Sequence, residues 1–291
     1  MDVAIGLPST VPGARGDQLV EFAKRADAAG FSALSTLDRM AFANYEPLVS
    51  LAAAAAVTER IKLMSSIVIA PYRFNAALLA KQAASVQLIS NGRLMLGLAA
   101  GGRENDYAVS GVDFESRYRR FEEMVGQVKE LCAGSDDASG DPDSMAVGPD
   151  VSANPPALIL GGYTPATFKR VAKYADGWVA GGMPPDQFAE SSAGVVQAWE
   201  EAGREGRPYL GGLTYFALGE TGADDAQAYL GSYYQWLGEE TVGMIVDSAA
   251  KDAETVRVYL QAFEDAGCEE LIFFPSSGEP EQVDLLADAA L

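Results

Sequence analysis

The sequence predicts a single (β/α)8 TIM barrel, an α/β fold in which eight parallel strands alternate with helices. Apolar strand-like runs alternate with amphipathic helical stretches along the chain. The central unit, Arg60–Gly102, is typical of strand, helix and strand, and both strands are apolar on both faces, as in parallel sheets covered by helices. The 291 residues are enough for one such barrel, which uses about 250 residues. We therefore expect one domain over residues 1–291.

Local signals place each element of the first half. The third predicted strand is rich in β-branched residues and stops at Pro71. The helix after it carries apolar side chains at helical spacing and ends at Asn91-Gly92, a pair typical of helix C-termini. In order, the strands and helices are predicted at residues 2–7, 17–29, 33–37, 47–57, 61–70, 76–89 and 94–99.

The second half continues the alternation after a polar loop predicted at residues 103–107. Residues 133–156 hold aspartates, serines and prolines with little periodicity, which is typical of a flexible connector. Residues 221–250 carry tyrosines and a tryptophan whose spacing fits either a lid over a site or ordinary helix packing. The remaining strands and helices are predicted at residues 115–132, 157–160, 164–174, 177–180, 185–202, 210–218, 223–236, 254–266, 270–274 and 279–291.

The charge of the chain limits the class of partner. A formal net charge of -20 and an isoelectric point near 4.3, without any basic run, argue against a nucleic-acid groove or an anionic membrane surface. The longest nearly apolar run, residues 48–57, is far shorter than a membrane span. The chain enters its first strand without a signal-peptide pattern, so we expect a cytoplasmic protein that acts on a small-molecule substrate.

Histidine and cysteine usage excludes several kinds of catalytic site. The sequence has no histidine, which rules out serine–histidine and cysteine–histidine nucleophiles and histidine-ligated zinc. Its two cysteines, Cys132 and Cys268, form neither a disulfide framework nor a zinc site alone. We expect two buried thiols and no metal site.

Ligands of such barrels bind at the C-terminal ends of the strands. Glycine recurs at these ends and lets a flat ligand approach the backbone, although each glycine alone also suits a strand-to-loop turn. Together the glycines favour a broad planar ligand. Asp38 and Arg39 follow the second strand and form either a rim ion pair, with each other or with another loop, or polar contacts to a ligand. Ser65 and Ser66 need hydrogen-bond partners if they are buried.

The stretch Gly161–Trp178 holds a second candidate feature. Thr164 has the position of a helix N-cap, Pro165 that of the first helical residue, and Thr167 lies one turn into the helix. Free amides, two hydroxyls and the positive end of the helix dipole would then face the strand ends and form a seat for a phosphate. Ordinary helix capping explains the same spacing equally well.

Four blocks of the sequence resemble the luciferase-like monooxygenase superfamily, the barrel family of bacterial luciferase and of flavin- or deazaflavin-dependent oxidoreductases. The blocks are Thr58–Leu63, Ala70–Arg73, Ala80–Leu98 and Gly161–Trp178. The resemblance covers nearly the whole chain and implies a barrel that holds FMN, or the deazaflavin coenzyme F420, at the strand C-termini. It also implies that Gly161–Thr167 receives the cofactor phosphate.

The resemblance further implies roles for residues that follow the second and third strands. In this family the segment matching Ser66-Ile67 often contains a non-proline cis peptide bond beneath the isoalloxazine ring. Asp38 matches the family acid, whereas Arg39 stands where many members have a histidine used in proton transfer. Arg39 is instead expected to stabilise an anionic reduced flavin, a peroxy adduct or a substrate carboxylate.

The candidate catalytic residues are therefore Asp38 and Arg39. The candidate cofactor-binding residues lie at the strand ends and near the start of one helix: Gly6, Asp38, Ser65, Ser66, Ile67, Gly101, Gly102, Gly161, Gly162, Thr164, Thr167 and Trp178.

The leading functional hypothesis is a flavin-dependent monooxygenase that uses oxygen and reduced FMN, supplied by a separate flavin reductase, on a small organic substrate. Hydride transfer with coenzyme F420 is the second hypothesis, and a non-catalytic flavin-binding protein is the third. The alanine-rich helices at residues 47–57 and 76–89, together with the family resemblance, predict a homodimer, although alanine also suits helix packing within one barrel.

Overall fold

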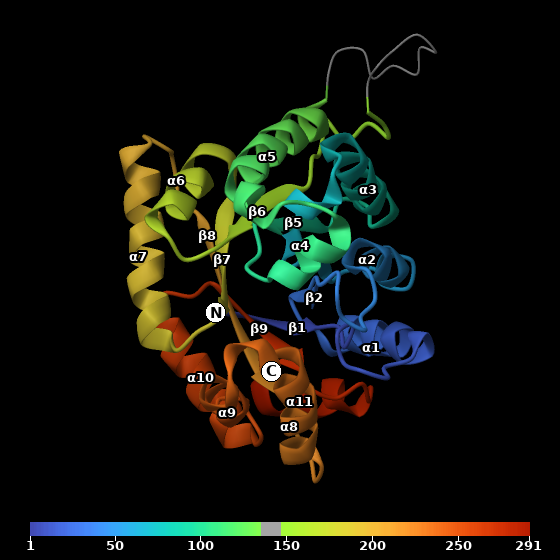
Figure 1. The fold of residues 1–291 in the computed structure, drawn as a ribbon. Coiled ribbons are helices and arrows are strands. Elements are labelled where there is room, and N and C mark those ends of the chain that lie inside the picture. The colour runs from blue at the N-terminus through green and yellow to red at the C-terminus, as the bar shows by residue number, and fades with distance from the viewer. Residues whose placement is uncertain (135–146) are drawn as a thin grey trace.

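In residues 1–134 and 147–291, which the computed structural model describes, the strands form one parallel sheet that closes into a barrel surrounded by helices (Figure 1). The strands are β1 (Asp2–Gly6), β2 (Ala33–Thr36), β3 (Lys62–Ser65), β4 (Val68–Ile69), β5 (Leu94–Ala99), β6 (Ala157–Gly161), β7 (Gly177–Gly182), β8 (Tyr209–Phe216) and β9 (Glu270–Pro275). β3 and β4 together fill one of the eight strand positions, and pairing of β3 with β5 closes the ring. The predicted (β/α)8 barrel is confirmed.

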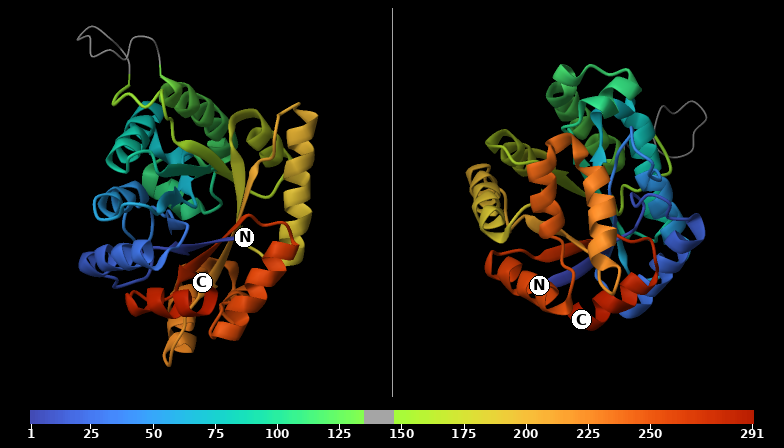
Figure 2. Two further views of the ribbon diagram at one scale, coloured as in Figure 1. Left: turned by 180° about the vertical axis from the view of Figure 1, so that it is seen from behind. Right: turned by 60° about the horizontal axis from the view of Figure 1, so that its bottom comes forward.

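Helices connect successive strands on the outside of the barrel. They are α1 (Gly16–Ala29), α2 (Pro47–Ala55), α3 (Ala76–Ile89), α4 (Glu104–Ser110), α5 (Arg117–Ala133), α6 (Pro165–Tyr174), α7 (Pro185–Glu201), α8 (Gly222–Tyr233), α9 (Glu239–Asp247), α10 (Ala253–Asp265) and α11 (Glu281–Ala290). Short 3-10 helices lie between some of them: η1 (Pro71–Arg73), η2 (Phe114–Ser116) and η3 (Gln235–Leu237). The two chain termini lie near each other in both views of Figure 2, beside the N-terminal end of β1.

Alternate residues along the strands supply two separate apolar cores. In β9, Leu271 and Phe273 belong to the core between the sheet and the helices, whereas Ile272 and Phe274 belong to the core inside the barrel. Met64 of β3 also packs in the inner core. Because side chains fill the barrel interior, a ligand site has to form at an end of the barrel.

Capping signals explain why α3 has the bounds that its sequence predicts. The Asn75 side chain caps its start by accepting a hydrogen bond from the Leu78 amide at 3.1 Å. Asn91 and Gly92 follow its end with positive φ angles of 55° and 86°, which turn the chain away from the helix axis toward β5.

The structure corrects the predicted elements at the third strand and after β5, and it adds α9, which the sequence analysis does not predict. The single strand predicted at residues 61–70 is divided into β3 and β4 by Ser66-Ile67. The residues predicted as a polar loop lie largely in α4, where Tyr107 is buried against Tyr72 and Phe114 with ring centroids 5.6 and 5.3 Å apart. This packing stabilises a helix whose polar sequence gives no apolar stripe.

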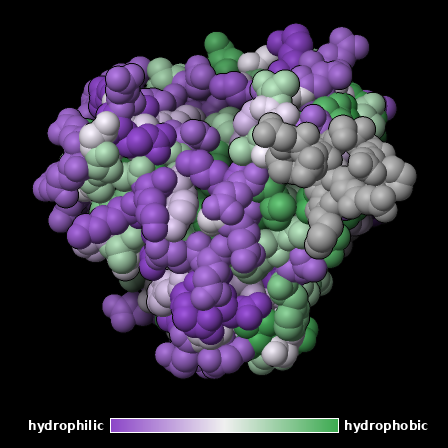
Figure 3. Space-filling model, turned by 90° about the horizontal axis from the view of Figure 1, so that it is seen from above, coloured by the Kyte–Doolittle hydropathy of each residue, from purple (hydrophilic) through white to green (hydrophobic). Residues whose placement is uncertain are grey.

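Other regions of the chain bear on the remaining expectations. Of the connector predicted at residues 133–156, residues 135–146 lie outside the described residues. The predicted lid, residues 221–250, forms α8, η3 and α9. Figure 3 shows that hydrophilic residues cover most of one face of the molecule, with hydrophobic residues in smaller patches. Within the described part of the chain, no helix combines the length and apolar character that crossing a membrane requires.

The two thiols lie where the sequence predicts them. Cys132 and Cys268 are both free and buried. They are far apart in the sequence but belong to the same core between the sheet and the helices. Burial raises the pKa of the Cys132 thiol to about 11 and that of Cys268 to about 12. Thiols with such high pKa values are poor nucleophiles at neutral pH, so both act as core side chains.

Candidate active site

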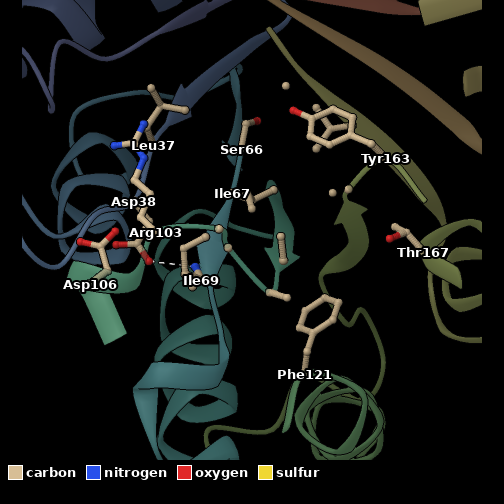
Figure 4. Close-up of a pocket in the computed structure, with 18 of the residues that line it drawn as sticks. Leu37, Asp38, Ser66, Ile67, Ile69, Arg103, Asp106, Phe121, Tyr163 and Thr167 are labelled. Atoms are coloured by element: carbon tan, nitrogen blue, oxygen red, sulfur yellow. Dashed lines mark hydrogen bonds between the residues drawn. The ribbon is translucent and has the colours of Figure 1, made fainter. Parts of the chain in front are cut away.

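A cavity of about 370 Å³ opens at the C-terminal ends of the strands, within the range of roughly 300–1,000 Å³ typical of ligand pockets. Its wall comes from the segments that follow β2, β3, β5, β6 and β7, and Tyr233 and Tyr234 add to it from the end of α8. Figure 4 shows side chains from these segments around Ile67. The predicted site residues that line the cavity are Asp38, Arg39, Ser66, Ile67, Gly101, Gly102, Gly161, Gly162, Thr164 and Thr167.

Gly6, Ser65 and Trp178, the other predicted cofactor-binding residues, lie behind the cavity wall. A Cβ atom added to Gly6 would overlap the Phe274 ring, so this glycine serves inner-core packing. The Ser65 hydroxyl exchanges two hydrogen bonds of 2.9 Å with the backbone of Gly97. Trp178 is fully buried, and its indole N–H donates to the Gly162 carbonyl at 2.8 Å. Trp178 therefore positions Gly162 of the wall, and Ser65 joins β3 to β5 behind the wall.

Ser66 and Ile67 form the floor of the cavity. Their peptide bond is cis, as the family resemblance implies, and the Ile67 side chain points into the cavity (Figure 4). The Ser66 hydroxyl accepts a hydrogen bond from Ser35 at 2.8 Å, so both buried serines of this segment have the partners that burial demands. Gly97 on β5 leaves room for the segment, because a Cβ at this position would overlap the Ser65 carbonyl oxygen.

Asp38 is held by an ion pair behind the floor. Its Oδ2 atom accepts hydrogen bonds of 2.9 Å from the Ile69 amide and from Arg73, which also donates to Glu46 at 2.7 Å. The Asp38 side chain is only 2% exposed. Burial raises the pKa of the Asp38 carboxyl, and the nearby Arg73 guanidinium opposes the rise. The neighbouring Tyr72 hydroxyl has no hydrogen-bond partner among the described residues.

Arg39 forms a second buried ion pair, with Asp106 of α4. The Arg39 Nε donates to Asp106 at 2.8 Å, and the backbone amides of Met40 and Ala41 donate to the other carboxylate oxygen at 3.0 and 2.6 Å. Burial raises the pKa of the Asp106 carboxyl, and the two amides oppose that rise. Asp38 and Arg39 thus each pair with another segment, as one of the alternative interpretations expects, and both also line the cavity.

The start of α6 forms a polar corner of the cavity. Thr164 caps the helix by accepting a hydrogen bond from the Thr167 amide at 3.3 Å, and the two hydroxyl oxygens lie 3.2 Å apart. Pro165 is the first helical residue, as predicted. Arg170 lines the cavity one turn later and pairs with Glu122 at 3.0 Å. Amides, hydroxyls and one guanidinium therefore converge at a helix N-terminus, where an anion is favoured.

Several residues of the wall are absent from the sequence-based predictions. Arg170 follows Thr167 by three positions in a helix and so shares its face, which is a signal available in the sequence. Arg103 directly follows the predicted rim glycines. Asp106 and Phe121 carry no local signal, because only the fold brings their helices to the cavity. In the described residues no group of three or more histidine, cysteine, aspartate or glutamate side chains is placed to hold a metal ion.

Comparison with solved structures finds barrels of the same shape. An F420-dependent secondary alcohol dehydrogenase in complex with an F420–acetone adduct has a TM-score of 0.79 at 17% identity, covering 99% of this chain and 98% of the other. The FMN-bound oxygenating constituent of 3,6-diketocamphane monooxygenase of Pseudomonas putida has a TM-score of 0.75 at 15% identity, covering 99% of this chain and 96% of the other. At these identities the likeness shows the fold alone.

Comparison of sequences identifies the family. The pyrimidine monooxygenase RutA of Escherichia coli is 28% identical over 224 residues, which are 73% of this chain and 60% of RutA. The family described as luciferase-like monooxygenase matches residues 2–288. Because this match spans nearly the whole chain, which also folds as a (β/α)8 barrel with a cavity at its strand C-termini, the protein belongs to the luciferase-like monooxygenase family.

Proposed function

We propose that this protein is a flavin-dependent oxidoreductase that binds reduced FMN in the strand-end cavity and oxygenates a small organic substrate. The observation that carries the proposal is the pairing of an apolar floor at Ile67 with an anion-binding corner at Thr164 and Thr167 in one cavity. A flat ring with a phosphate tail needs both features at once. Membership of the luciferase-like monooxygenase family supports the same reaction class.

The glycines of the wall leave space for a planar ring. A Cβ at Gly161 would stand 3.4 Å from the Ile67 side chain, over the floor. Gly101 has a φ of +71°, and a Cβ there would lie 2.8 Å from Ile69. At Gly102, no heavy atom of the described residues lies within 4 Å of an added Cβ. These residues therefore fit a bound isoalloxazine or deazaflavin ring, with backbone available on one side of it.

Different residues of the cavity bind the cofactor, exclude water and accept a proton. When bound, reduced FMN supplies the electrons and the reaction with oxygen. Thr164, Thr167 and Arg170 hold the phosphate, and Tyr233 with its neighbours excludes water from the cavity mouth. Asp38 is the proposed proton acceptor, because its Oδ1 atom is not engaged by Ile69 or Arg73 and burial raises the pKa of this carboxyl.

Combined replacement of Thr164 and Thr167 by alanine is expected to weaken FMN binding by about 1–3 kcal/mol, because two hydroxyl donors to the phosphate are lost. Calorimetric titration of FMN against both proteins measures the difference. The matched control is Thr241→Ala, a half-buried threonine of α9 outside the cavity lining, which should leave the affinity unchanged. Wild-type affinity in the double variant would place the phosphate elsewhere.

Hydride transfer with coenzyme F420 is the second candidate, favoured by the structural likeness to an F420-dependent alcohol dehydrogenase. Oxygen uptake separates the two reactions. The protein is supplied with reduced FMN from a flavin reductase and NADH, and uptake beyond that of free reduced FMN is recorded over a substrate panel. Substrate-dependent uptake is the expected result. Turnover with reduced F420, without such uptake, would replace monooxygenation by hydride transfer, and FMN binding without turnover of either kind would favour a non-catalytic flavoprotein.

A separate flavin reductase and a second copy of the chain are the proposed partners. Exposed apolar side chains lie on α2 and α3: Val49 is 65% exposed, Leu78 53% and Leu88 50%. Neighbouring small residues let helices pack closely, so this face suits a copy of itself. Light scattering is expected to give a particle mass near twice the chain mass of 30.7 kDa, and a mass near that of one chain would contradict the dimer.

A further inference from the structure

We propose that Arg103 binds a carboxylate, or a similar anionic group, on an organic substrate whose planar body packs against the aromatic side chains at the end of α8. This inference rests on the proposed function and deepens it, because it names the substrate class of the same cavity. It starts from one positive charge in the cavity wall, Arg103, which has no ion-pair partner among the described residues.

Arg103 reaches across the wall of the cavity from the segment between β5 and α4. Its side chain runs from the side that carries Asp106 toward Leu37 (Figure 4). The guanidinium carbon lies 4.3 Å from the ring centroid of Tyr233, 5.4 Å from that of Tyr234 and 5.3 Å from that of Trp236. These rings stabilise the charge from their faces, and the Tyr233 hydroxyl also interacts with the guanidinium.

Every other charged side chain of the lining is already paired. Arg39 pairs with Asp106, Asp38 with Arg73, and Arg170 with Glu122. Arg103 alone of these has no carboxylate within 4.0 Å among the described residues, where its Nη1 atom is also buried without any hydrogen-bond partner. Asp106 is close enough to interact with the Arg103 charge, but its oxygens accept hydrogen bonds from Arg39 and from two backbone amides instead of an ion pair with Arg103. Among the described residues, Arg103 is therefore the charged side chain of the cavity wall that has no ion-pair partner.

A carboxylate on the substrate is the group best suited to bind the Arg103 guanidinium. The guanidinium presents its N–H donors as a planar fork, which a carboxylate accepts with two parallel hydrogen bonds. The chain as a whole carries a charge of -20 and repels anions at a distance, so selection of an anionic substrate has to come from a local cation. The tyrosine and tryptophan rings around Arg103 provide an apolar wall for a planar or aromatic body.

The cofactor phosphate has a separate place in the same cavity. Thr167 lies on one side of Ile67 in Figure 4, whereas Arg103 extends on the other side, toward Leu37. The corner at α6 also has its own guanidinium, Arg170. Two anion-binding positions separated by the floor suit a phosphate on the cofactor and a carboxylate on the substrate.

Matched acids and amides test the inference. Benzoate, benzamide, phenylacetate and phenylacetamide are titrated into the protein with and without FMN, followed by flavin absorbance and tryptophan fluorescence. Trp236 is the informative fluorophore, because Trp178 and Trp199 are buried. The acids are expected to bind at least about tenfold more tightly than their amides. Arg103→Met should remove this preference while the FMN affinity changes less than about twofold, and Arg103→Lys should keep part of it.

Arg119→Met is the matched control, since it removes one positive charge from an exposed position on α5 and should leave the preference intact. Equal binding of acids and amides, including no binding of either, would overturn the inference, as would an unchanged preference in Arg103→Met. A large loss of FMN affinity in Arg103→Met would assign the residue to the cofactor and also overturn it. If the wild type bound neither FMN nor F420, the proposed function would be contradicted instead. The fluorescence titration without FMN measures the preference for acids over amides independently of cofactor binding.

Discussion

Asp38→Asn is expected to lower the turnover number by about 10²–10⁴-fold, the range that a positioned acid or base contributes. The amide keeps the size of the carboxyl and still accepts hydrogen bonds from Ile69 and Arg73, so the floor of the cavity stays in place. It cannot take up a proton. In a chain without histidine, no imidazole is present to substitute for the lost carboxylate.

The pH dependence of turnover gives this prediction a second readout. Burial raises the pKa of the Asp38 carboxyl above its ordinary value of 3.8, so the protonated form persists to higher pH than in an exposed aspartate. A base is active only when ionised, and turnover should therefore rise with pH through this raised pKa. The Asn variant should lose the rise together with the rate.

Glu46→Gln is the matched control for Asp38→Asn. Glu46 is the more exposed partner of Arg73, and its replacement leaves the Asp38–Arg73 ion pair intact. Its turnover should stay within about tenfold of the wild type and keep the same rise with pH. Near-wild-type turnover in Asp38→Asn, with the acid side of the profile unchanged, would exclude Asp38 as the proton acceptor.

Gly97→Ala is expected to lower the free energy of unfolding by about 1–3 kcal/mol and to abolish most FMN binding. The added Cβ would overlap the Ser65 carbonyl oxygen and stand 3.1 Å from the Ile67 side chain. A backbone oxygen cannot rotate away as a flexible side chain does. The added methyl group would therefore displace β3 and the floor of the cavity together. We expect the variant to lose both stability and the surface that binds FMN.

Gly102→Ala provides the comparison for Gly97→Ala. In the described part of the chain, no heavy atom lies within 4 Å of a Cβ at Gly102, so the free energy of unfolding of this variant should stay within about 0.5 kcal/mol of the wild type. Urea denaturation measures both variants, and FMN titration measures the binding surface. Wild-type stability and FMN affinity in Gly97→Ala would show that β5 and the floor do not constrain each other.

Much of the fold follows from local rules that a sequence displays. The helix at residues 76–89 begins at an asparagine cap and ends at Asn91-Gly92, and the structure has the same bounds. Two features depend on tertiary contacts instead. The break between β3 and β4 lies within one continuous apolar run, and α4 depends on the packing of Tyr107 against Tyr72. Neither the strand break nor the packing of Tyr107 produces a hydrophobic periodicity or a capping motif in the sequence.

The candidate site divides in the same way. The glycines of the strand ends and the Thr164 cap are local features, so the sequence predicts them, and the structure places them around one cavity. The ion pairs join residues far apart in sequence: Asp38 pairs with Arg73 across 35 positions, and Arg39 with Asp106 across 67. Spacing cannot predict such partners. That Arg103 lacks an ion-pair partner among the described residues becomes evident only after the partners of the other charged side chains in the wall are known.

The crystal structure of the protein soaked with FMN, and separately with F420, tests the binding site most directly. We predict ring density over Ile67, with the phosphate within hydrogen-bond distance of Thr164 and Thr167. Density for the ring at the N-terminal end of the barrel, or a phosphate held away from the start of α6, would contradict the account.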